Sequence, residues 1–275
     1  MPPPPATPVL PPDAHPVSGD TDGRMRLRIR FSKLGKVRFT SHRDTARIWE
    51  RALRRVEMPV AYSEGFAPRP KLSFGLALST GHESLGEYLD VDLRPPEGTS
   101  VDVAAIQARL DPALPAGFAV QGAAVVEPGT PSLQEAVTSC TWRLEVIADD
   151  PGEVAGAVEH LLGEDQLVVT RERKGRETTE DLRCALLDLS VVGRTPSGTE
   201  LHAELANQPR ALRAADLIAA LVAGRPGWRD GRVCRIHQFI RAGDERIEPL
   251  PSPPEVAGWS LAQHSAPPVP EARAS

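Results

Sequence analysis

The sequence predicts an α+β protein made of two ferredoxin-like halves, the split βαβ arrangement, with antiparallel sheets. Three observations lead to this prediction. Several short stretches alternate apolar and polar residues, other stretches have helical spacing, and both patterns occur in the same order in the two halves of the chain. Hydrophobic residues make up 40% of the 275 residues, so a substantial core can be buried, and with only 4% aromatic residues that core must be mostly aliphatic.

The first half, residues 24–128, begins with the clearest strand. Leu27, Ile29 and Phe31 alternate with arginines, as expected for a half-buried strand over 26–31. Val37–Phe39 is expected to continue in β structure, and Ser41 then suits the N-cap of a helix. The further elements predicted in this half are that helix over 43–56, strands near 60–63, 70–78, 86–93 and 117–125, and a helix over 101–110.

The second half, residues 138–243, repeats this order after a Pro- and Gly-containing linker at 127–131. Pro151 is placed where the first turn of a helix tolerates proline, and Gly224 is a stop signal for another helix. The predicted elements are strands over 140–148, 166–173, 180–192, 199–206 and 232–241, with helices over 152–162 and 210–223. Each half therefore has the order β-α-β-β-α-β, with one extra strand.

Two proline-rich tails flank this core, residues 1–23 and 249–275. Their composition lacks enough apolar surface to offset the chain entropy lost on folding, so both tails are predicted to be disordered, and Trp259 is an isolated aromatic in the second. No stretch approaches 18 consecutive apolar residues, which predicts no membrane span. Three widely spaced cysteines favour a reducing, cytoplasmic setting and argue against disulfides, zinc ribbons and iron–sulfur clusters.

Charge is unevenly distributed along the chain. Its net charge is −5, yet residues 24–71 hold fourteen Lys and Arg against four Asp and Glu. Within the predicted helix, Trp49, Ala52, Leu53 and Val56 form the apolar stripe, and arginines recur every three or four residues on another face. Those arginines are Arg43, Arg47, Arg51 and Arg54. Such a row is typical of a phosphate-binding surface, although a solvated helix face, or pairing with acidic parts of the molecule, is an alternative.

The loop Tyr62-Ser-Glu-Gly-Phe-Ala-Pro-Arg-Pro-Lys-Leu-Ser-Phe-Gly75 is rich in glycine, proline, aromatics and cations. A stiff loop that presents Tyr62 or Phe66 with Arg69 and Lys71 suits stacking on bases beside phosphate contacts. The alternative is a connection whose aromatics pack into the core. We therefore predict an RNA-binding surface made of Arg43, Arg47, Arg51, Arg54, Tyr62, Phe66, Arg69, Lys71 and His42.

Four segments carry a resemblance to a known family: Phe39-Thr-Ser-His-Arg-Asp44, Arg51-Ala-Leu-Arg-Arg55, Tyr62 to Lys71, and Leu85-Gly-Glu-Tyr-Leu-Asp90. The sequence resembles the radical-SAM-associated domain of unknown function, most strongly over 25–95. The resemblance implies a partner that holds S-adenosylmethionine and an iron–sulfur cluster and acts on RNA. This chain has no CxxxCxxC motif, so we expect no cofactor in it.

No catalytic motif stands out. Ser41, His42 and Asp44 have the residue types of a triad, but neighbours at a helix start do not face one another. Asp90 and Asp92 share the outer face of a strand, where salt bridges to arginines are favoured over a metal site.

The first hypothesis is thus a non-catalytic module that binds tRNA or rRNA, without DNA specificity or a membrane, for a radical SAM enzyme. The second is a metal-independent endoribonuclease of the CRISPR repeat-cleaving type that uses His42. The third is a protein–protein adaptor with a basic docking face.

Overall fold

The computed structural model describes residues 24–250 except 128, 174 and 244, together with 256 and 259–261. The strands are β1 (Met25–Lys33), β2 (Leu72–Phe74), β3 (Glu83–Leu93), β4 (Phe118–Val126), β5 (Val137–Ile147), β6 (Val168–Arg173), β7 (Arg176–Asp181), β8 (Leu186–Arg194), β9 (Thr199–Ala206), β10 (Arg229–Ala242) and β11 (Glu245–Ile247). The α-helices are α1 (His42–Arg55), α2 (Ile106–Leu110), α3 (Leu133–Ala136), α4 (Pro151–Gly163) and α5 (Ala214–Val222). Short 3₁₀ turns occupy Gly35–Phe39, Asp111–Ala113 and Arg183–Ala185.

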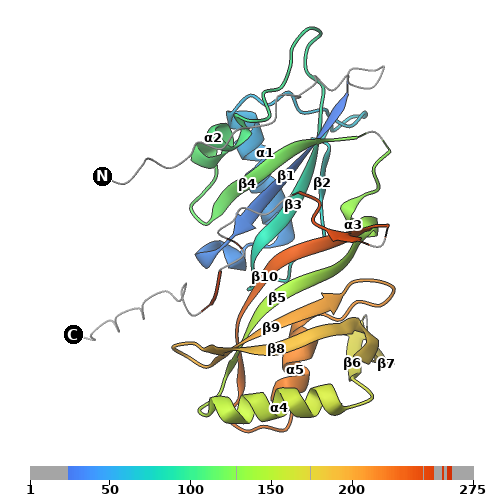
Figure 1. Ribbon diagram of the computed structural model, residues 1–275. Coiled ribbons are helices and arrows are strands. Elements are labelled where there is room, and N and C mark those ends of the chain that lie inside the picture. The colour runs from blue at the N-terminus through green and yellow to red at the C-terminus, as the bar shows by residue number, and fades with distance from the viewer. Residues whose placement is uncertain are drawn as a thin grey trace, which may run out of the picture.

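Nine strands form one mostly antiparallel sheet that runs through both halves of the chain (Figure 1). Its order is β4-β1-β3-β10-β5-β9-β8, with β2 added to β3 and β11 added to β10. The two halves meet where β10 pairs with β3 in parallel, Cys234 opposite Glu83. β6 and β7 form a separate two-stranded hairpin. The α+β class expected from the sequence is confirmed.

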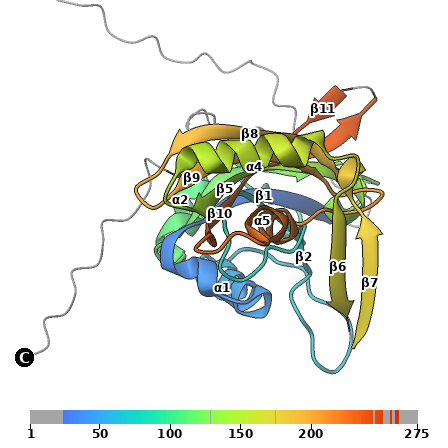
Figure 2. The same cartoon turned by 90° about the horizontal axis from the view of Figure 1, so that it is seen from below.

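One face of the sheet carries α1 in the first half and α5 in the second (Figure 2). The strand register shows why. Phe31 of β1 packs on Trp49 of α1 with ring centroids 4.8 Å apart, so Phe31 marks the face of the sheet that α1 covers. Phe31 stands opposite Glu87 of β3, which therefore lies on the same face. Farther along, Trp142 stands opposite Ala203, and both belong to the apolar cluster that includes the buried side of α5. The cores of the two halves therefore lie on the same side of a continuous sheet.

Several element predictions were wrong for identifiable reasons. Gly35 has φ of +67°, which starts a 3₁₀ turn, so Val37–Phe39 does not continue the strand. Prolines near the predicted strands at 60–63 and 70–78 remove ladder donors, and only β2 forms there. The predicted strand over 180–192 is divided because the Asp181 carboxylate accepts hydrogen bonds from the amides of Leu167 and Arg183, which turns the chain. The helix predicted over 101–110 begins at Ile106.

Part of the second predicted tail is packed against the fold, contrary to the disorder expected for 249–275. Val256, Trp259 and Leu261 are buried with Leu85, Cys234 and Ile236. Burying one tryptophan removes a large apolar surface from water, which composition averaged over the whole segment hides. The prediction for residues 1–23 lies outside the described residues. Among the helices that the structure describes, none is long and apolar enough to cross a bilayer.

Candidate functional site

The helix that carries the predicted arginines is fixed at its start by a reciprocal cap. The Ser41 Oγ accepts a hydrogen bond from the Asp44 amide at 3.1 Å and donates one to the Asp44 carboxylate at 2.8 Å. Trp49, Ala52 and Leu53 are buried, as the helical spacing predicted. Because one face of α1 is held in the core, the opposite face must point to solvent.

The arginine row lies on that solvent face. Arg43, Arg47, Arg51 and Arg54 are all exposed, and at 3.6 residues per turn they fall within an arc of roughly 80°. Arg47 reaches the Asp44 carboxylate at 3.4 Å, and Arg51 Nε donates to the Arg47 carbonyl at 3.2 Å. Among the described residues, the side chains of Arg43 and Arg54 have no hydrogen bond or ion pair. The row therefore presents cations that are only weakly compensated.

The loop of residues 62–71 is a narrow projection whose base is tied by backbone bonds. Tyr62 pairs with Pro70 in an isolated bridge, and Ser63 and Arg69 exchange hydrogen bonds of 2.8 and 3.0 Å. Phe66 is completely exposed and Tyr62 is 48% exposed, so neither packs into the core. Arg69 is exposed and Lys71 half-buried. The loop thus displays two aromatic side chains beside cations, as predicted.

A small cavity lies between the loop and helix α1. Arg54 and Tyr62 line the same cavity of about 210 Å³, and Glu50 and Glu57 line it as well. The structure therefore brings one arginine of the row next to one predicted aromatic. The two glutamates lower the local positive potential at this end, as Asp44 does at the start of α1.

His42 is exposed at the first turn of α1, with its ring edge against Phe74 at a centroid distance of 5.2 Å. Asp44 is engaged with Ser41 and Arg47 and does not orient the imidazole. The residues of the apparent triad therefore form a helix cap rather than a relay. Within the part of the chain that the structure describes, no group of three His, Cys, Asp or Glu side chains is arranged to hold a metal ion.

Sequence reasoning missed an arginine–aromatic pair beside the start of α1. Arg38 lies 4.6 Å above the Phe39 ring, and Phe39 is 61% exposed. The sequence assigned these residues to a strand, and the pair was therefore missed. Val37 and Phe39 are large apolar residues that are not followed by further buried strand residues, and this could have indicated a turn. The pair adds an exposed ring to the end of the row at which His42 and Arg43 lie.

The arginines of β1 belong to a different environment. Arg28 forms a bidentate pair with Asp90 at 2.8 and 2.9 Å, and Arg26 pairs with Asp92 at 3.1 Å. Arg30 is fully buried and donates to Tyr88 at 3.0 Å and to Glu248 at 2.7 Å. These three cations are neutralised within the fold. The salt bridges expected for Asp90 and Asp92 are confirmed, and the arginines of α1 are less compensated than those of β1.

The comparisons with known proteins give a family but no activity. None of the curated proteins matches the chain. Residues 26–214 match the model of a family described as "Uncharacterized protein conserved in bacteria", DUF2344. This match covers more than half of the 275 residues; it includes α1, the loop and the strands from β1 to β9, and it ends before β10. The chain therefore belongs to the DUF2344 family.

Proposed function

We propose that the protein is a non-catalytic RNA-binding module whose contact surface is the exposed face of α1 with the loop of residues 62–71. The observation that carries this proposal is the row Arg43, Arg47, Arg51 and Arg54, which is exposed and almost unpaired while the β1 arginines are neutralised. Like charges four residues apart on a helix destabilise it slightly, so a fold gains nothing from such a row. A polyanion that lies along it would relieve the repulsion.

Single-stranded RNA fits this surface better than duplex DNA. Phe66 and Tyr62 display rings on which an unpaired base can stack, whereas the bases of a duplex are already stacked on one another. Loops and ends of tRNA or rRNA offer such bases next to closely spaced phosphates. The arginines would hold the phosphates, and the aromatics would contact the bases.

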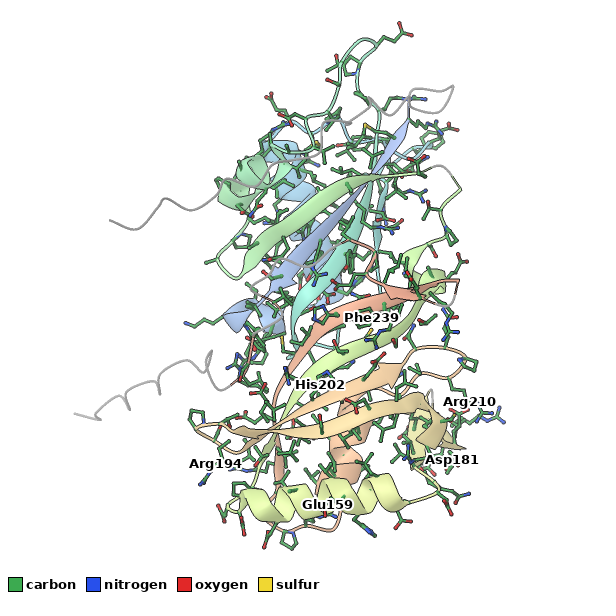
Figure 3. All side chains as sticks on the ribbon, viewed as in Figure 1. Glu159, Asp181, Arg194, His202, Arg210 and Phe239 are labelled. Carbon is green, nitrogen blue, oxygen red and sulfur yellow. The ribbon has the colours of Figure 1, made fainter. Side chains whose placement is uncertain are left out.

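The test is a salt titration of RNA binding by the full chain. About five phosphate contacts to a single strand predict a slope of log K against log salt near −3.5. The variant Arg47→Glu/Arg51→Glu should bind RNA more weakly and reduce the slope by about 1.4, because two contacts are lost. The matched control is Arg194→Glu/Arg210→Glu, which changes the charge equally at exposed positions of the second half (Figure 3).

The outcomes separate the competing functions. A slope near zero, or equal binding by the α1 variant and the control, would contradict the RNA proposal. Capture of a protein partner that survives nuclease treatment, with no RNA binding, would instead make the α1 face a docking surface. Cleavage of RNA in EDTA that is lost in His42→Ala would make the protein an endoribonuclease.

The resemblance to radical-SAM-associated domains supports the further proposal that the module presents RNA to a radical SAM enzyme. In that arrangement S-adenosylmethionine and the iron–sulfur cluster belong to the partner. Co-purification of such an enzyme with the wild-type chain, enhanced by RNA, is the expected result. A partner whose binding is unaffected both by RNA and by Arg47→Glu/Arg51→Glu would contradict it.

The two halves also support a proposed origin in one duplicated ferredoxin-like unit, over 24–128 and 138–243. In the first half the sheet order is β4-β1-β3-β2, and in the second it is β10-β5-β9-β8. When β6 and β7 are set aside as an insertion, both orders run last, first, third, second in chain order. An experimental structure in which either half departs from this order would contradict the duplication.

A further inference from the structure

A cavity of about 430 Å³ lies at the seam between the two halves, on the face of the sheet that carries α1 and α5. Here we call it the seam cavity. One wall is the segment of residues 76–82, which connects β2 to β3 in the first half. The other wall comes from the second half, from the end of β9 to the first residue of α5. Neither half encloses this space alone.

The floor of the seam cavity holds a buried ion pair. Arg235 is 2% exposed, and its Nε and Nη2 donate to the Glu87 carboxylate at 3.0 and 2.6 Å. Nη2 also donates to the Leu76 carbonyl at 2.8 Å, so the pair fixes the wall to the floor. Removing two charges from water is costly, and an apolar pair of similar size often gives equal or greater stability. Stability alone therefore does not account for an arginine at this position.

An aromatic platform lies beside that arginine. The Arg235 guanidinium stands 5.4 Å from the centre of the Trp142 ring, and the His82 ring meets Trp142 edge-on at 6.2 Å. Burial, and then the nearby charge of Arg235, lower the pKa of His82, so its imidazole is neutral near pH 7 and can both donate and accept a hydrogen bond. The Trp142 ring therefore offers an apolar surface that is bordered by the polar groups of His82 and Arg235.

The remaining lining suits a planar ligand with an anionic tail. Leu76, Leu78 and Leu212 supply apolar walls, and Asn207 adds an amide. Arg213 is exposed at the rim, so the residues that line the cavity include two arginines and no carboxylate. The start of α5 is already occupied by the Asp216 carboxylate, which accepts from the Arg213 amide and pairs with Arg171 at 2.5 Å. An anion would therefore be held by the Arg213 side chain rather than by the helix end.

We propose that the seam cavity binds a single unpaired nucleotide of the RNA, with its base against Trp142 and its phosphate at Arg213. The volume lies in the range of small-molecule pockets, and pockets for extruded bases combine aromatic stacking with hydrogen bonds to the base edge in the same way. This inference rests on the proposed RNA-binding function and deepens it. The arginine row would hold the strand, and the seam cavity would select one nucleotide.

The path from the row to the cavity is short. His42, at the start of α1, touches Phe74 at the end of β2, and Leu76 of the cavity wall follows two residues later. The start of α1 is therefore the end that is linked to the cavity wall through Phe74.

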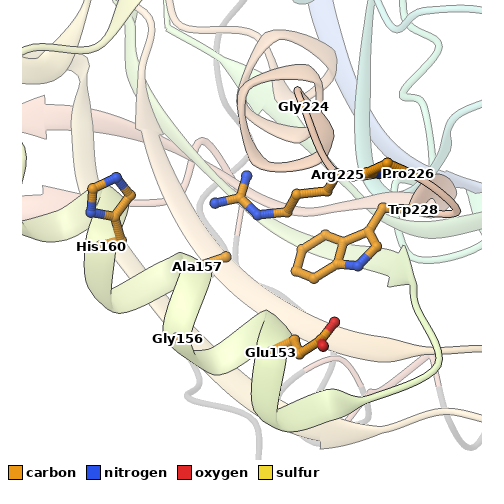
Figure 4. A pocket seen from close by; sticks show the side chains of 8 residues that line it. All are labelled: Glu153, Gly156, Ala157, His160, Gly224, Arg225, Pro226 and Trp228. Carbon is orange, nitrogen blue, oxygen red and sulfur yellow. The ribbon is translucent and has the colours of Figure 1, made fainter.

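A second hollow, of about 490 Å³, lies between α4 and the segment after α5 and also holds a tryptophan, an arginine and a histidine, but it is less suited to an anion (Figure 4). Its arginine, Arg225, donates to the Leu221 and Ala223 carbonyls and packs over Trp228, so it already has partners. Glu153 lines the same hollow and would repel a phosphate.

The experiment titrates the full-length protein with AMP, GMP, CMP and UMP by isothermal calorimetry, with inorganic phosphate as the comparison. At least one mononucleotide should bind saturably and more than tenfold more tightly than phosphate. Ala77→Trp, which fills the cavity from an exposed wall position, should weaken that binding at least tenfold, and Arg213→Ala about fivefold. The control Arg210→Ala removes a nearby exposed arginine outside the cavity and should change it less than twofold.

The results also distinguish this inference from the RNA proposal. No saturable nucleotide binding, or binding that both Ala77→Trp and Arg213→Ala leave unchanged, would overturn the seam cavity as a nucleotide site even where RNA still binds through α1. Nucleotide binding that Arg47→Glu/Arg51→Glu leaves intact, while RNA binding falls, would support both proposals. Nucleotide binding lost in Ala77→Trp without any RNA binding would retain the cavity as a nucleotide site and reject the RNA surface.

Discussion

Two sets of arginines in the first half have opposite environments although the sequence presents them alike. Those of β1 alternate along a strand, and each meets an acidic or carbonyl oxygen: Arg28 is paired with Asp90, and Arg30 is enclosed by Tyr88 and Glu248. Those of α1 recur at helical spacing and remain on the surface, with Arg47 weakly paired to Asp44. The first set belongs to the fold, and the second is available to a partner.

The difference comes from which elements pack against each set. Arg28 and Arg30 are buried, Arg28 against Asp90 of β3 and Arg30 against Glu248 and Leu250, so their charges must be compensated inside the molecule. The face of α1 opposite Trp49 has no covering element among the described residues. The number of arginines in a sequence segment therefore overstates the positive charge available for binding. Arginines on a strand that stand opposite acidic residues should be left out of that number.

The largest effect is expected from unpairing a β1 arginine. Arg28→Ala leaves the Asp90 carboxylate buried without its partner, which should lower the free energy of unfolding by about 3–5 kcal/mol in urea denaturation. The matched control is Arg26→Ala on the same strand, whose pair with Asp92 is 42% and 32% exposed and should contribute less than about 1 kcal/mol. Equal losses in the two variants would show that burial does not distinguish the pairs. Arg28→Leu/Asp90→Leu should recover most of the loss.

A similar contrast holds for two aromatics that both looked like surface residues in the sequence. Trp259→Ala should cost about 3 kcal/mol because the ring is buried in the cluster with Leu85, Cys234 and Ile236. Phe66→Ala should change stability by less than about 0.5 kcal/mol because the ring is completely exposed. Thermal or urea unfolding of both variants checks this. A negligible effect of Trp259→Ala would mean that the C-terminal segment is not part of the stable fold.

A smaller, pH-dependent effect is expected from the buried carboxylate of Glu145. Burial alone would raise its pKa, but hydrogen bonds from Ser197 at 2.6 Å, from Thr195 and from the Arg232 amide at 3.0 Å outweigh burial and hold the pKa below its usual value of 4.5. A carboxylate with a lowered pKa stabilises the fold above its unfolded pKa, and this stabilisation is lost as the pH falls through the folded value.

Glu145→Gln should therefore lower the free energy of unfolding by about 2 kcal/mol near neutral pH. The gap between wild type and variant should narrow as the pH falls below 4.5. Urea titrations at several pH values measure this gap. A gap that is the same at every pH would contradict the assigned role of the ionised carboxylate.

The sequence was informative where one residue decides a local structure, and less so where distant segments meet. Ser41 and the spacing of Trp49, Ala52 and Leu53 were enough to locate α1 and its exposed face. The Leu27, Ile29 and Phe31 alternation located β1 in the same way. By contrast, the position of Trp259 depends on apolar residues of β3 and β10, and no local pattern in a proline-rich segment indicates that contact. The seam cavity was also missed, because Arg235, Trp142 and His82 come from three separate elements and form no motif.

The smallest effect on stability is expected from replacing Arg51, and this replacement tests most directly whether the arginine row of α1 serves binding rather than folding. Arg51→Gln removes a charge that neighbours Arg47 on the helix surface, so relief of repulsion and loss of an exposed hydrogen bond should nearly cancel. The free energy of unfolding should change by less than about 0.5 kcal/mol, and any stabilisation should fade in high salt because the repulsion is screened. Urea denaturation at low and high salt measures both quantities. A loss above about 1 kcal/mol would place Arg51 with the structural arginines of β1 and remove the main support for a binding surface on α1.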